Sequence, residues 1–538
     1  MMITKIHIQG YRKLKEFLFE PNNGMNIIVG GNDAGKSTLL EAISLCLTGR
    51  INGQRASDVL NPYWFNTELV AEFFAARKNN QTVPPPEIRI ELHLEVSKGE
   101  LENMRGVNNM KREDAAGLSM WIHPDPEYLE ELDEYFSQVD CPPIIPIEYY
   151  LVEWKNFAET IIFNRPKGLG VAVINSRTIR SDRGMDFYTK QLLESKLDPK
   201  DRNKVSVKHR QLRNNLGSEL IEDINTSLHE NLSPSESGRW LVGLQIDQSR
   251  STSWESTLIP EIDRIPFSMS GQGAQVIAKA SLALSQSEDS TSFLLIEEPE
   301  NHLTHTRLRE LLSIIERNSM GRQVFITTHS SYVLNRLGLN QLVLLHGGSH
   351  KSFSGLSKET TEYFQLISGF DTLRLVLADK MVIVEGPSDE IIFNHFFKDK
   401  YGREPMAFGI DVMSIRGTSF LRSFELASLL DRQLIALRDN DGQEPEHWIK
   451  RLEPFLLEGK RQMFIGNPED GRTLEPQILT ANPHLCETNG DYEKKLKKMQ
   501  DNKTATALNI AQSDEKLTPP PYFKEAIAAL MKNTEVSI

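Results

Sequence analysis

Three features are scarce in this chain of 538 residues: cysteine, long apolar runs and excess positive charge. The three cysteines, Cys46, Cys141 and Cys486, lie far apart in sequence, which excludes a disulfide framework and a C-x-x-C zinc site and favours a reducing compartment. The longest apolar runs, such as residues 292–296, are far below the roughly 20 residues that a membrane span needs, and no apolar signal region opens the sequence. We therefore expect a soluble cytoplasmic protein with no membrane partner.

Charge and length set two further limits. The chain has 61 lysine and arginine residues against 74 aspartate and glutamate residues, a net charge of −13. This balance argues against a protein that coats nucleic acid nonspecifically, because that mode needs excess positive charge facing the phosphates. It does not exclude a nuclease, since acidic metal sites consume carboxylates. With 39% hydrophobic residues over this length, the chain should bury two or more domain cores.

The first part of the chain has the apolar patterns of an α/β fold. Alternation of apolar and polar residues predicts half-buried strands at 3–9 and 87–96, the second of them antiparallel. A continuous apolar run predicts a buried strand at 26–29, and the periodicity of residues 39–47 predicts a helix. These elements place a β-rich lobe beside the first helix.

A helical insertion follows, and the α/β pattern then returns. Apolar residues recur every fourth position on one face of a predicted long helix, at Leu212, Leu216, Leu220, Ile224 and Leu228. Beyond it, a helix is predicted at 268–284 and strands at 293–298 and 323–328. A second α/β unit begins at Lys380.

Residues 30–37 read Gly-Gly-Asn-Asp-Ala-Gly-Lys-Ser and fit the pattern G-x-x-x-x-G-K-[ST], between the strand and the helix that this motif requires. The backbone N–H groups of such a loop cradle phosphates at a helix N-terminus. Lys36 would supply charge to the outer phosphates, and Ser37 would offer a hydroxyl to Mg²⁺. We expect an ATP site formed by Gly30, Asn32, Gly35, Lys36, Ser37 and Thr38.

Two downstream features would complete that site. The strand at 293–298 delivers Glu297 and Glu298 at its C-terminal end, where α/β sheets bind ligands. Glu297 would hold Mg²⁺ through water, and Glu298 would orient the attacking water. A glycine loop opens the helix before this strand and suits phosphate binding by backbone amides; its residues are Ser270, Gly271 and Gly273.

Together these motifs resemble the ABC-type ATPase family, in its SMC and RecF-like branch rather than its transporters. Residues 6–12 look like the N-terminal strand of that branch. The resemblance implies that residues 270–273 form a signature loop, which in such proteins reaches across to the ATP of a partner subunit. It also implies that His329 is the switch histidine that senses the γ-phosphate. At least a homodimer follows from the shared site.

Five acids in the C-terminal region form a second constellation: Glu385, Asp389, Asp439, Asp441 and Glu475. The first pair follows the predicted strand 381–384 and is spaced four residues apart, so that both acids can face one point across a helical turn. The second pair consists of alternate residues after the strand 434–437, which project from a turn toward a common cation. The fifth acid lies further along the chain.

In this order and at strand ends, the acids resemble the signature of the Toprim domain, a strand-terminal Glu followed by D-x-D. Toprim domains serve primases, topoisomerases and nucleases. An SMC-like ATPase followed by a Toprim domain is the pattern of the OLD (overcoming lysogenization defect) family of nucleases, and the similarity spans essentially the whole chain. Residues 297–303 and 384–390 are especially similar, and Lys503 matches the late active-site lysine of that family.

The resemblance implies an α/β architecture in which an ABC-type (SMC/RecF-like) ATPase carries an inserted helical dimerisation arm and precedes a Rossmann-like Toprim domain. The expected boundaries are 1–182 and 251–375 for the two parts of the ATPase, 183–250 for the arm and 376–538 for the Toprim nuclease domain.

The implied function is an ATP-binding DNA endonuclease that nicks or cuts both strands and depends on Mg²⁺ or Mn²⁺. The five acids would hold one or two ions, Lys503 would stabilise charge on the phosphate, and the ATPase would regulate the nuclease. Similarity to the nuclease subunit of the Gabija system, which is paired with a helicase, suggests a role in antiphage defence and a possible helicase or other defence-system partner.

Other functions stay open. An ATP-driven DNA sensor or clamp in DNA repair needs no nuclease, and Toprim domains also serve topoisomerases and primases. The lack of clustered cysteines weakens a zinc-bearing primase, and no tyrosine is marked as a strand-transfer nucleophile. Basic residues in 200–213, and a run comprising Lys494, Lys495, Lys497 and Lys498, are candidate DNA contacts, although solvated helix faces explain them at least as well.

Overall fold

The chain is described from a computed structural model, in which it forms two compact units. The described residues are 1–95, 102–138, 141–166, 168–175, 198–216, 221–231, 244–245, 261–285, 291–353, 355–366, 372–415, 420–486, 489–513 and 515–532. The first unit comprises Met1–Met25 and Ser37–Thr327, and the second comprises Asn26–Lys36 and Thr328–Ile538.

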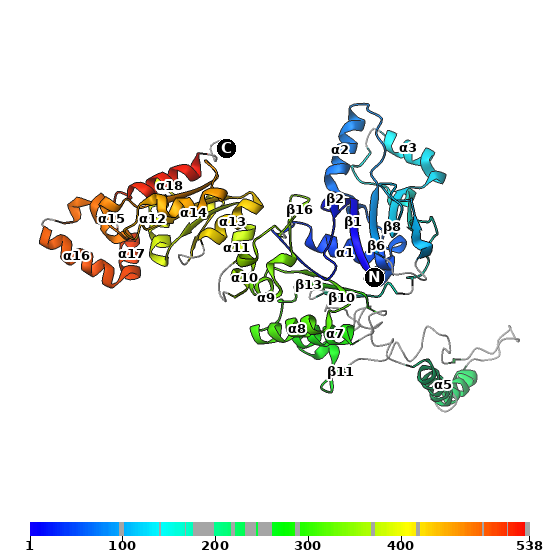
Figure 1. Cartoon of the computed structure of the whole chain (residues 1–538). Coiled ribbons are helices and arrows are strands. Elements are labelled where there is room, and N and C mark those ends of the chain that lie inside the picture. The colour runs from blue at the N-terminus through cyan, green and yellow to red at the C-terminus, as the bar shows by residue number, and fades with distance from the viewer. Residues whose placement is uncertain are drawn as a thin grey trace. The chain divides into compact units, whose positions relative to one another are not determined.

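The first unit opens with an antiparallel sheet of six strands (Figure 1). Its strands are β1 (Met2–Tyr11), β2 (Leu14–Phe19), β6 (Ile88–Glu95), β7 (Arg105–Gly106), β8 (Ala115–Pro124) and β9 (Tyr150–Asn156). The central strand β6 pairs with β1 and with β8, and Ile8 lies opposite Ile90 in the first of these pairings. Ile6 and Ile8 are fully buried, as the alternating sequence predicts, and the expected antiparallel strand at 87–96 is confirmed.

Helix α1 (Lys36–Thr48) lies against this sheet. The Sγ atom of Cys46 is 3.5 Å from the backbone oxygen of Ile90, and the indole nitrogen of Trp154 donates to the backbone oxygen of Cys46 at 2.8 Å. Gly49 ends the helix with φ +65°, and a Cβ atom there would lie 2.7 Å from the Trp154 ring, so only glycine fits. Helices α2 (Thr67–Lys78) and α3 (Leu129–Ser137) pack together through an edge-to-face pair of rings, Phe73 and Phe136.

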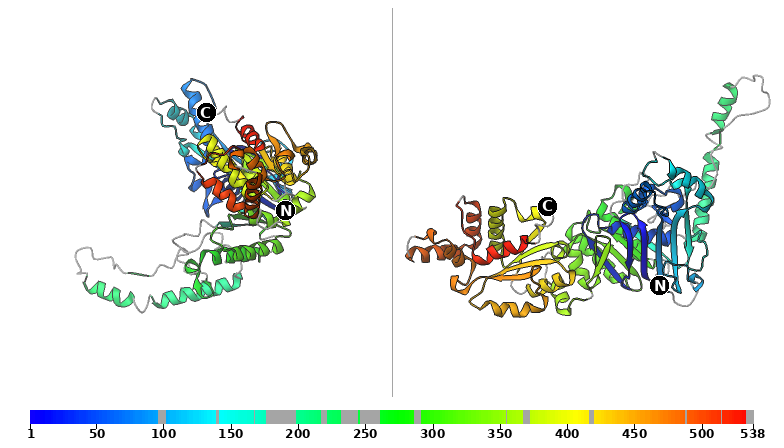
Figure 2. Two further views of the ribbon diagram at one scale, coloured as in Figure 1. Left: turned by 90° about the vertical axis from the view of Figure 1, so that its left-hand side faces the viewer. Right: turned by 90° about the horizontal axis from the view of Figure 1, so that it is seen from above.

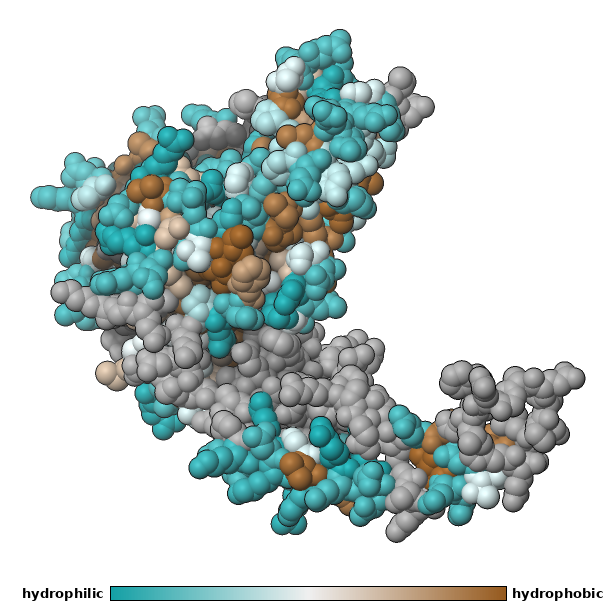
Figure 3. All heavy atoms as spheres, turned by 90° about the vertical axis from the view of Figure 1, so that its right-hand side faces the viewer, coloured by the Kyte–Doolittle hydropathy of each residue, from teal (hydrophilic) through white to brown (hydrophobic). Residues whose placement is uncertain are grey.

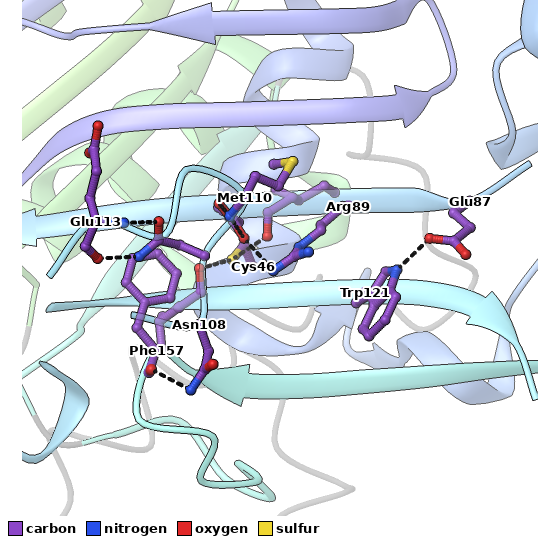
Figure 4. A network of polar contacts seen from close by, with 12 residues as sticks. Cys46, Glu87, Arg89, Asn108, Met110, Glu113, Trp121 and Phe157 are labelled. Carbon is purple, nitrogen blue, oxygen red and sulfur yellow. Dashed lines mark hydrogen bonds and ion pairs between the residues drawn. The ribbon is translucent and has the colours of Figure 1, made fainter. Parts of the chain in front are cut away.

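A network of polar contacts, in which Figure 4 labels Arg89, Met110 and the pair Glu87 and Trp121, holds a buried carboxylate within the antiparallel sheet. Glu91 on β6 has no exposed side-chain surface, accepts hydrogen bonds from the backbone nitrogen of Met110 at 2.9 and 3.0 Å, and pairs with Arg89 at 2.9 Å. Burial raises the pKa of Glu91, and the Met110 amide and Arg89 oppose that effect. Trp121 on β8 donates to Glu87 at 2.9 Å. The hydrogen bonds from Met110 tie the loop at 108–113 to the sheet.

The first unit continues with three parallel strands and two flanking helices. The elements are β10 (Val171–Asn175), α7 (Gln272–Leu284), β13 (Phe293–Glu297), α8 (His305–Asn318) and β14 (Gln323–Thr327). Strand β13 pairs with β10 on one side and β14 on the other. Every residue of β13 and β14 is buried, as expected for parallel strands covered on both faces.

The predicted long helix at 212–228 is described as two helices, α5 (Pro199–Leu216) and α6 (Glu222–Asn231). Leu220, one of the apolar positions that carried the prediction, lies outside the described residues, as does most of the remainder of 183–250. Leu212 and Ile224 are 62% and 49% exposed, so neither packs into a core within the described part of the chain. On the face shown in Figure 3, hydrophobic side chains form small groups among hydrophilic ones.

The second unit begins at the phosphate loop and resumes after β14. Its first strands are β3 (Met25–Gly30), β15 (Leu342–His346), which is parallel to β3, and the antiparallel edge strand β16 (Ser349–Ser352). Helix α9 (Ser331–Leu337) precedes β15 in sequence, α10 (Lys358–Leu366) and α11 (Thr372–Leu377) follow β16, and both α10 and α11 pack on α9.

A four-stranded parallel sheet forms the C-terminal part of this unit, in the order β18-β17-β19-β20 (Figure 2, yellow to orange). The strands are β17 (Lys380–Val384), β18 (Ile410–Ser414), β19 (Gln433–Arg438) and β20 (Arg461–Ile465). The helices are α12 (Pro387–Tyr401), α13 (Phe420–Leu430), α14 (Pro445–Leu452), α15 (Leu474–Ala481), α16 (Asn489–Asp501), α17 (Lys503–Gln512) and α18 (Pro521–Met531). One core joins strands β17, β18 and β19 to α12, α15 and α18.

Two sequence expectations on composition can be compared with the fold. All three cysteines are free thiols, as their spacing predicts. Among the described residues, no helix has the length and apolar character needed to cross a bilayer.

Candidate functional site

The phosphate loop connects β3 to α1. Gly30 ends the strand, and a Cβ atom there would lie 2.6 Å from the backbone oxygen of Leu345, which leaves room for glycine alone. Gly35 takes φ +95° and lets the chain turn into the helix. Lys36 is buried, and its ammonium group donates to the backbone oxygens of Gly30 and Gly31 at 3.0 and 2.9 Å. Strand, glycine turn and helix therefore occur as the motif requires, with Asn32 in the turn and Thr38 buried in the first turn of the helix.

Ser37 and Glu297, 260 residues apart in sequence, are in direct contact, because the Ser37 hydroxyl donates to the Glu297 carboxylate. Glu297 ends β13 and is only 8% exposed. Glu298 follows with φ +46°, and its carboxylate accepts a hydrogen bond from the Asn301 side chain at 2.7 Å. The two glutamates thus lie at the C-terminal end of a buried parallel strand, the edge at which such sheets bind ligands.

The other predicted nucleotide residues fall at helix and strand ends. Gly271 is the N-cap of α7, and a Cβ atom on Gly273 would lie 3.0 Å from the backbone oxygen of His302, so the start of this helix packs closely against the loop after Glu298. Ser270 precedes the cap and donates to the backbone oxygen of Pro266 at 3.3 Å. In the second unit, His329 is exposed and lines a cavity of about 470 Å³ together with Arg374.

In the C-terminal sheet, two neighbouring parallel strands bring acids to one edge. Glu385 directly follows β17, and Asp439 directly follows β19. Because β17 and β19 pair in parallel, their carboxyl ends meet, and the backbone nitrogen of Asp439 donates to the Glu385 carboxylate at 3.3 Å. Asp389 lies in the first turn of α12 and accepts from the backbone nitrogen of Gly386 at 3.1 Å.

Glu475 reaches the same group from α15. Its side chain is buried, accepts a hydrogen bond from the Thr473 hydroxyl at 2.7 Å and lies 3.4 Å from the ammonium group of Lys503. Lys503 begins α17, and α17 packs against α12, the helix that carries Asp389. Lys503 thus lies beside Glu475, the fifth acid of the set.

Crowding of these acids perturbs their protonation. Burial, together with the neighbouring charges of Glu385 and Glu475, raises the pKa of Asp389 to about 7. Burial raises the pKa of Asp439 to about 8, with Asp389 and Glu385 as the next causes. The pKa of Glu385 is also raised by burial, against the lowering effect of Arg438. Carboxylates that share a poorly solvated space retain protons unless a cation compensates them.

Asp441 lies in a different setting from the other four acids. It has φ +54° and a side chain that is 48% exposed, and its carboxylate pairs with Arg438 at 3.3 Å. Asp439 and Asp441 are alternate residues in sequence, but their side chains lie in different surroundings. The backbone turns at Asp441, where φ is positive.

The donor set fits a hard divalent cation, which prefers carboxylate oxygens. One oxygen of Asp439, Oδ1, is buried without a hydrogen-bond partner in the described part of the chain. Such an atom is available as a ligand. Nevertheless, among the described residues no three acidic, histidine or cysteine side chains are already arranged as a finished metal site. Binding would require some of the carboxylates to turn.

Three residues near the acids were not singled out from the sequence. Arg438 precedes Asp439 and contacts two of the five acids, while Trp448 covers its guanidinium. Tyr522, on α18, is only 4% exposed. Burial raises the pKa of its hydroxyl well above the ordinary value, and the nearby charges of four acids also raise it: Asp439, Asp389, Glu385 and Glu475. Arg438 lies in sequence between the predicted strand 434–437 and Asp439, but nothing in the local pattern marks Tyr522.

Of the lysine run on α16, three side chains are exposed and one is not. Lys495 donates to the backbone oxygen of Leu485 at 3.0 Å, so it serves the fold. Lys494, Lys497 and Lys498 stay available for other contacts.

Comparison with known families identifies the two parts. The model of an AAA ATPase domain matches residues 1–334, more than half of the chain. The chain belongs to this ATPase family. A second model, the TOPRIM domain of overcoming lysogenization defect (OLD) protein-like proteins, matches residues 376–441, which include Glu385, Asp389, Asp439 and Asp441. The expected α/β fold class, with an ATPase domain followed by an OLD-like Toprim domain, is confirmed.

Two curated relatives match stretches of different length in this AAA ATPase. The DNA replication and repair protein RecF of Streptococcus pyogenes serotype M4 is 22% identical over 367 residues, which cover 63% of this chain and 94% of RecF. RecF of Prosthecochloris aestuarii is 46% identical over 46 residues, 9% of this chain and 12% of that protein.

Two solved structures are similar to this chain. The C-terminal region of the Burkholderia pseudomallei OLD protein is 18% identical, with a TM-score of 0.24, and the match covers 29% of this chain and 98% of that one. The structure of RecF with ATP is 14% identical, with a TM-score of 0.32, and the match covers 65% of this chain and 97% of that one.

Proposed function

We propose that this AAA ATPase with an OLD-like Toprim domain is an ATP-binding, divalent-metal-dependent DNA endonuclease. The observation that carries the proposal is the grouping of Glu385, Asp389, Asp439 and Glu475 at the carboxyl edge of β17 and β19, with Lys503 beside them. Raised carboxyl pKa values in such a cluster are typical of a functional site that binds a cation. We assign the domains the boundaries stated above, with residues 376–538 as the nuclease.

In this proposal the four grouped acids would hold Mg²⁺ or Mn²⁺, and Asp441 would be available to a second ion. A bound ion would supply an activated water and charge stabilisation at the leaving oxygen of a phosphodiester. Lys503 holds positive charge at the edge of the acid cluster, where it would face a phosphate oxygen and oppose the repulsion between DNA and the carboxylates. Glu475 keeps that ammonium in place through their 3.4 Å contact.

The ATPase part would act as the regulator of cleavage. Lys36 and the backbone of Gly30, Asn32 and Gly35 would bind the phosphates of ATP, Ser37 and Glu297 would hold its Mg²⁺, and Glu298 would orient water. The direct Ser37–Glu297 hydrogen bond supports this pairing. Ser270, Gly271 and Gly273 would contact ATP bound to a second copy, so the working form would be a homodimer or a higher homo-oligomer. His329 would sense the γ-phosphate.

The likeness to OLD proteins leads us to propose a role in antiphage defence, with a helicase or another defence-system subunit as a possible partner. A second candidate function follows from the similarity to RecF over 63% of the chain. In it, the protein is an ATP-driven DNA-binding sensor or clamp in DNA repair, and the Toprim part binds without cutting.

A plasmid assay separates these functions. Supercoiled DNA is incubated with the full chain and Mg²⁺ or Mn²⁺, with and without ATP, and the products are resolved by electrophoresis. A nuclease gives nicked or linear DNA, a topoisomerase gives relaxed closed circles, and a sensor leaves the plasmid unchanged while retarding its migration. Unchanged plasmid under all metal conditions would remove the nuclease proposal.

A further inference from the structure

Arg438 is a buried cation inside the acid cluster. It is the last residue of β19, immediately before Asp439, and only 9% of its side chain is exposed. Its guanidinium lies over the Trp448 ring, with 3.5 Å between Cζ and the ring centroid, and 5.5 Å from the centroid of Phe420. Aromatic rings at these distances attract a guanidinium group, because the group is planar, positively charged and weakly hydrated.

The same guanidinium contacts one acid from each half of the Toprim motif. One of its terminal nitrogens, Nη2, lies 3.3 Å from Oδ2 of Asp441 and 3.7 Å from Oε1 of Glu385. The two carboxylates follow different strands, and Arg438 bridges them.

The surroundings keep Arg438 in place. The indole nitrogen of Trp448 donates to the backbone oxygen of Asn440 at 3.3 Å. The Asn440 side chain is fully buried and donates to the backbone oxygens of Gly466 and Gly471 at 3.1 and 2.7 Å. The turn between Asp439 and Asp441 is therefore rigid. The Trp448 ring that covers Arg438 is hydrogen-bonded to this turn.

We propose that Arg438 is a positioning residue that acts as a resident cation of the acid site: it holds the Glu385 and Asp441 carboxylates in their present positions and competes with divalent ions for them. The inference rests on the proposed metal-dependent function and deepens it. It accounts for two observations together, the separate setting of Asp441 and the lack of a finished three-ligand arrangement among the described acids.

The consequence is a limit on metal affinity. A divalent ion that takes Glu385 and Asp441 as ligands must displace their contacts with Arg438 and tolerate its charge nearby. Removing that charge should therefore strengthen metal binding, and we expect the dissociation constant for Mn²⁺ to fall by about tenfold. A purely structural arginine predicts the opposite, because outer-shell partners that only orient ligands weaken binding by about 10- to 100-fold when they are lost.

Calorimetric titration of the full chain with Mn²⁺ tests the proposal. Arg438→Gln removes the charge and keeps a hydrogen-bond donor, Arg438→Met removes both but keeps the apolar stem, and Arg438→Lys keeps the charge without the planar fork. Arg451→Met, which removes an exposed arginine from the same helix as Trp448, is the matched control. Thermal unfolding identifies any variant that has lost its fold, and the remaining neutral variant then decides.

Tighter Mn²⁺ binding by the neutral variants, with the lysine variant and the control close to the parent, supports the proposal. Unchanged or weaker binding by folded neutral variants overturns it, and the proposed function survives if the parent chain still binds Mn²⁺ and cuts DNA. If neither the parent nor any Arg438 variant binds Mn²⁺, the metal-dependent function and this inference fail together.

Discussion

The two candidate sites differ in how they balance charge. In the nucleotide site, the Lys36 ammonium is held by loop carbonyls, the Glu297 carboxylate accepts from Ser37, and Glu298 accepts from Asn301. In the acid site, Asp389 and Asp439 are half-buried, and the pKa of each is raised by burial and partly by the charges of its neighbours. The first site is satisfied by its own hydrogen bonds, whereas the second holds an excess of acids.

This difference indicates how each site should respond to its ligand. A preformed loop that donates backbone N–H groups needs little rearrangement to accept phosphate. A cluster of protonated and repelling carboxylates must release protons and turn before it can bind a cation. Metal binding should therefore depend strongly on pH, while the fold of the phosphate loop should not.

The largest expected effect is the loss of cleavage on neutralising a central acid. Asp439→Asn should reduce DNA cutting by about a thousandfold, because the metal contributes several kcal/mol to the transition state. ATP binding should remain, and thermal unfolding without metal should occur at a higher temperature, since repulsion within the cluster is relieved. Glu458→Gln, an exposed acid of the same unit, is the control. Full cleavage by Asp439→Asn would contradict the assignment.

A smaller effect is expected at the nucleotide site. Glu298→Gln should slow ATP hydrolysis by about a hundredfold while ATP binding persists, because the general-base contribution is lost and the phosphate loop is intact. The measurement is phosphate release under saturating ATP, with Glu310→Gln on the exposed face of α8 as control. Equal turnover in the variant and the parent would show that Glu298 does not orient the water. Mn²⁺ affinity of the acid site should be the same in both.

The pH dependence of stability provides a third test. The folded-state pKa values of Asp389 and Asp439 lie above their ordinary values, so the folded chain binds more protons than the unfolded chain does. In a metal chelator, stability should therefore fall as pH rises through these pKa values, by about 1 kcal/mol or more. Saturating Mn²⁺ should reverse the trend, because the ion binds the ionised acids. If Mn²⁺ left the unfolding temperature unchanged at every pH between the ordinary and the raised pKa values, the proposed crowding of ionised acids would be wrong.

The smallest expected effect concerns Tyr522. Its hydroxyl is buried and has no hydrogen-bond partner in the described part of the chain. Because an unpaired buried hydroxyl is unfavourable, Tyr522→Phe should leave the fold intact and raise the free energy of unfolding by up to about 1 kcal/mol. Denaturant titration checks this, with Tyr128→Phe, at an exposed ring, for comparison. Clear destabilisation would show that the hydroxyl has a partner in solution.

Much of the local structure could be predicted from the sequence. The strand before the phosphate loop, helix α1, and strands β13, β14, β17 and β19 all occur within one to three residues of the expected bounds. These elements are set by short-range patterns of apolar residues and glycine. The helix expected at 212–228 is described as two helices, α5 and α6, and residues 217–220 between them lie outside the described part of the chain.

The sequence by itself determined the glycine turn that holds Lys36 and the order of the acids along the chain, because both depend on neighbouring residues. Only the tertiary structure decided which acids meet. The parallel pairing of β17 with β19 joins Glu385 to Asp439, the packing of α15 and α17 adds Glu475 and Lys503, and an aromatic pocket places Arg438 against Asp441. Such convergence depends on strand register and helix packing over long sequence separations, which no local spacing encodes.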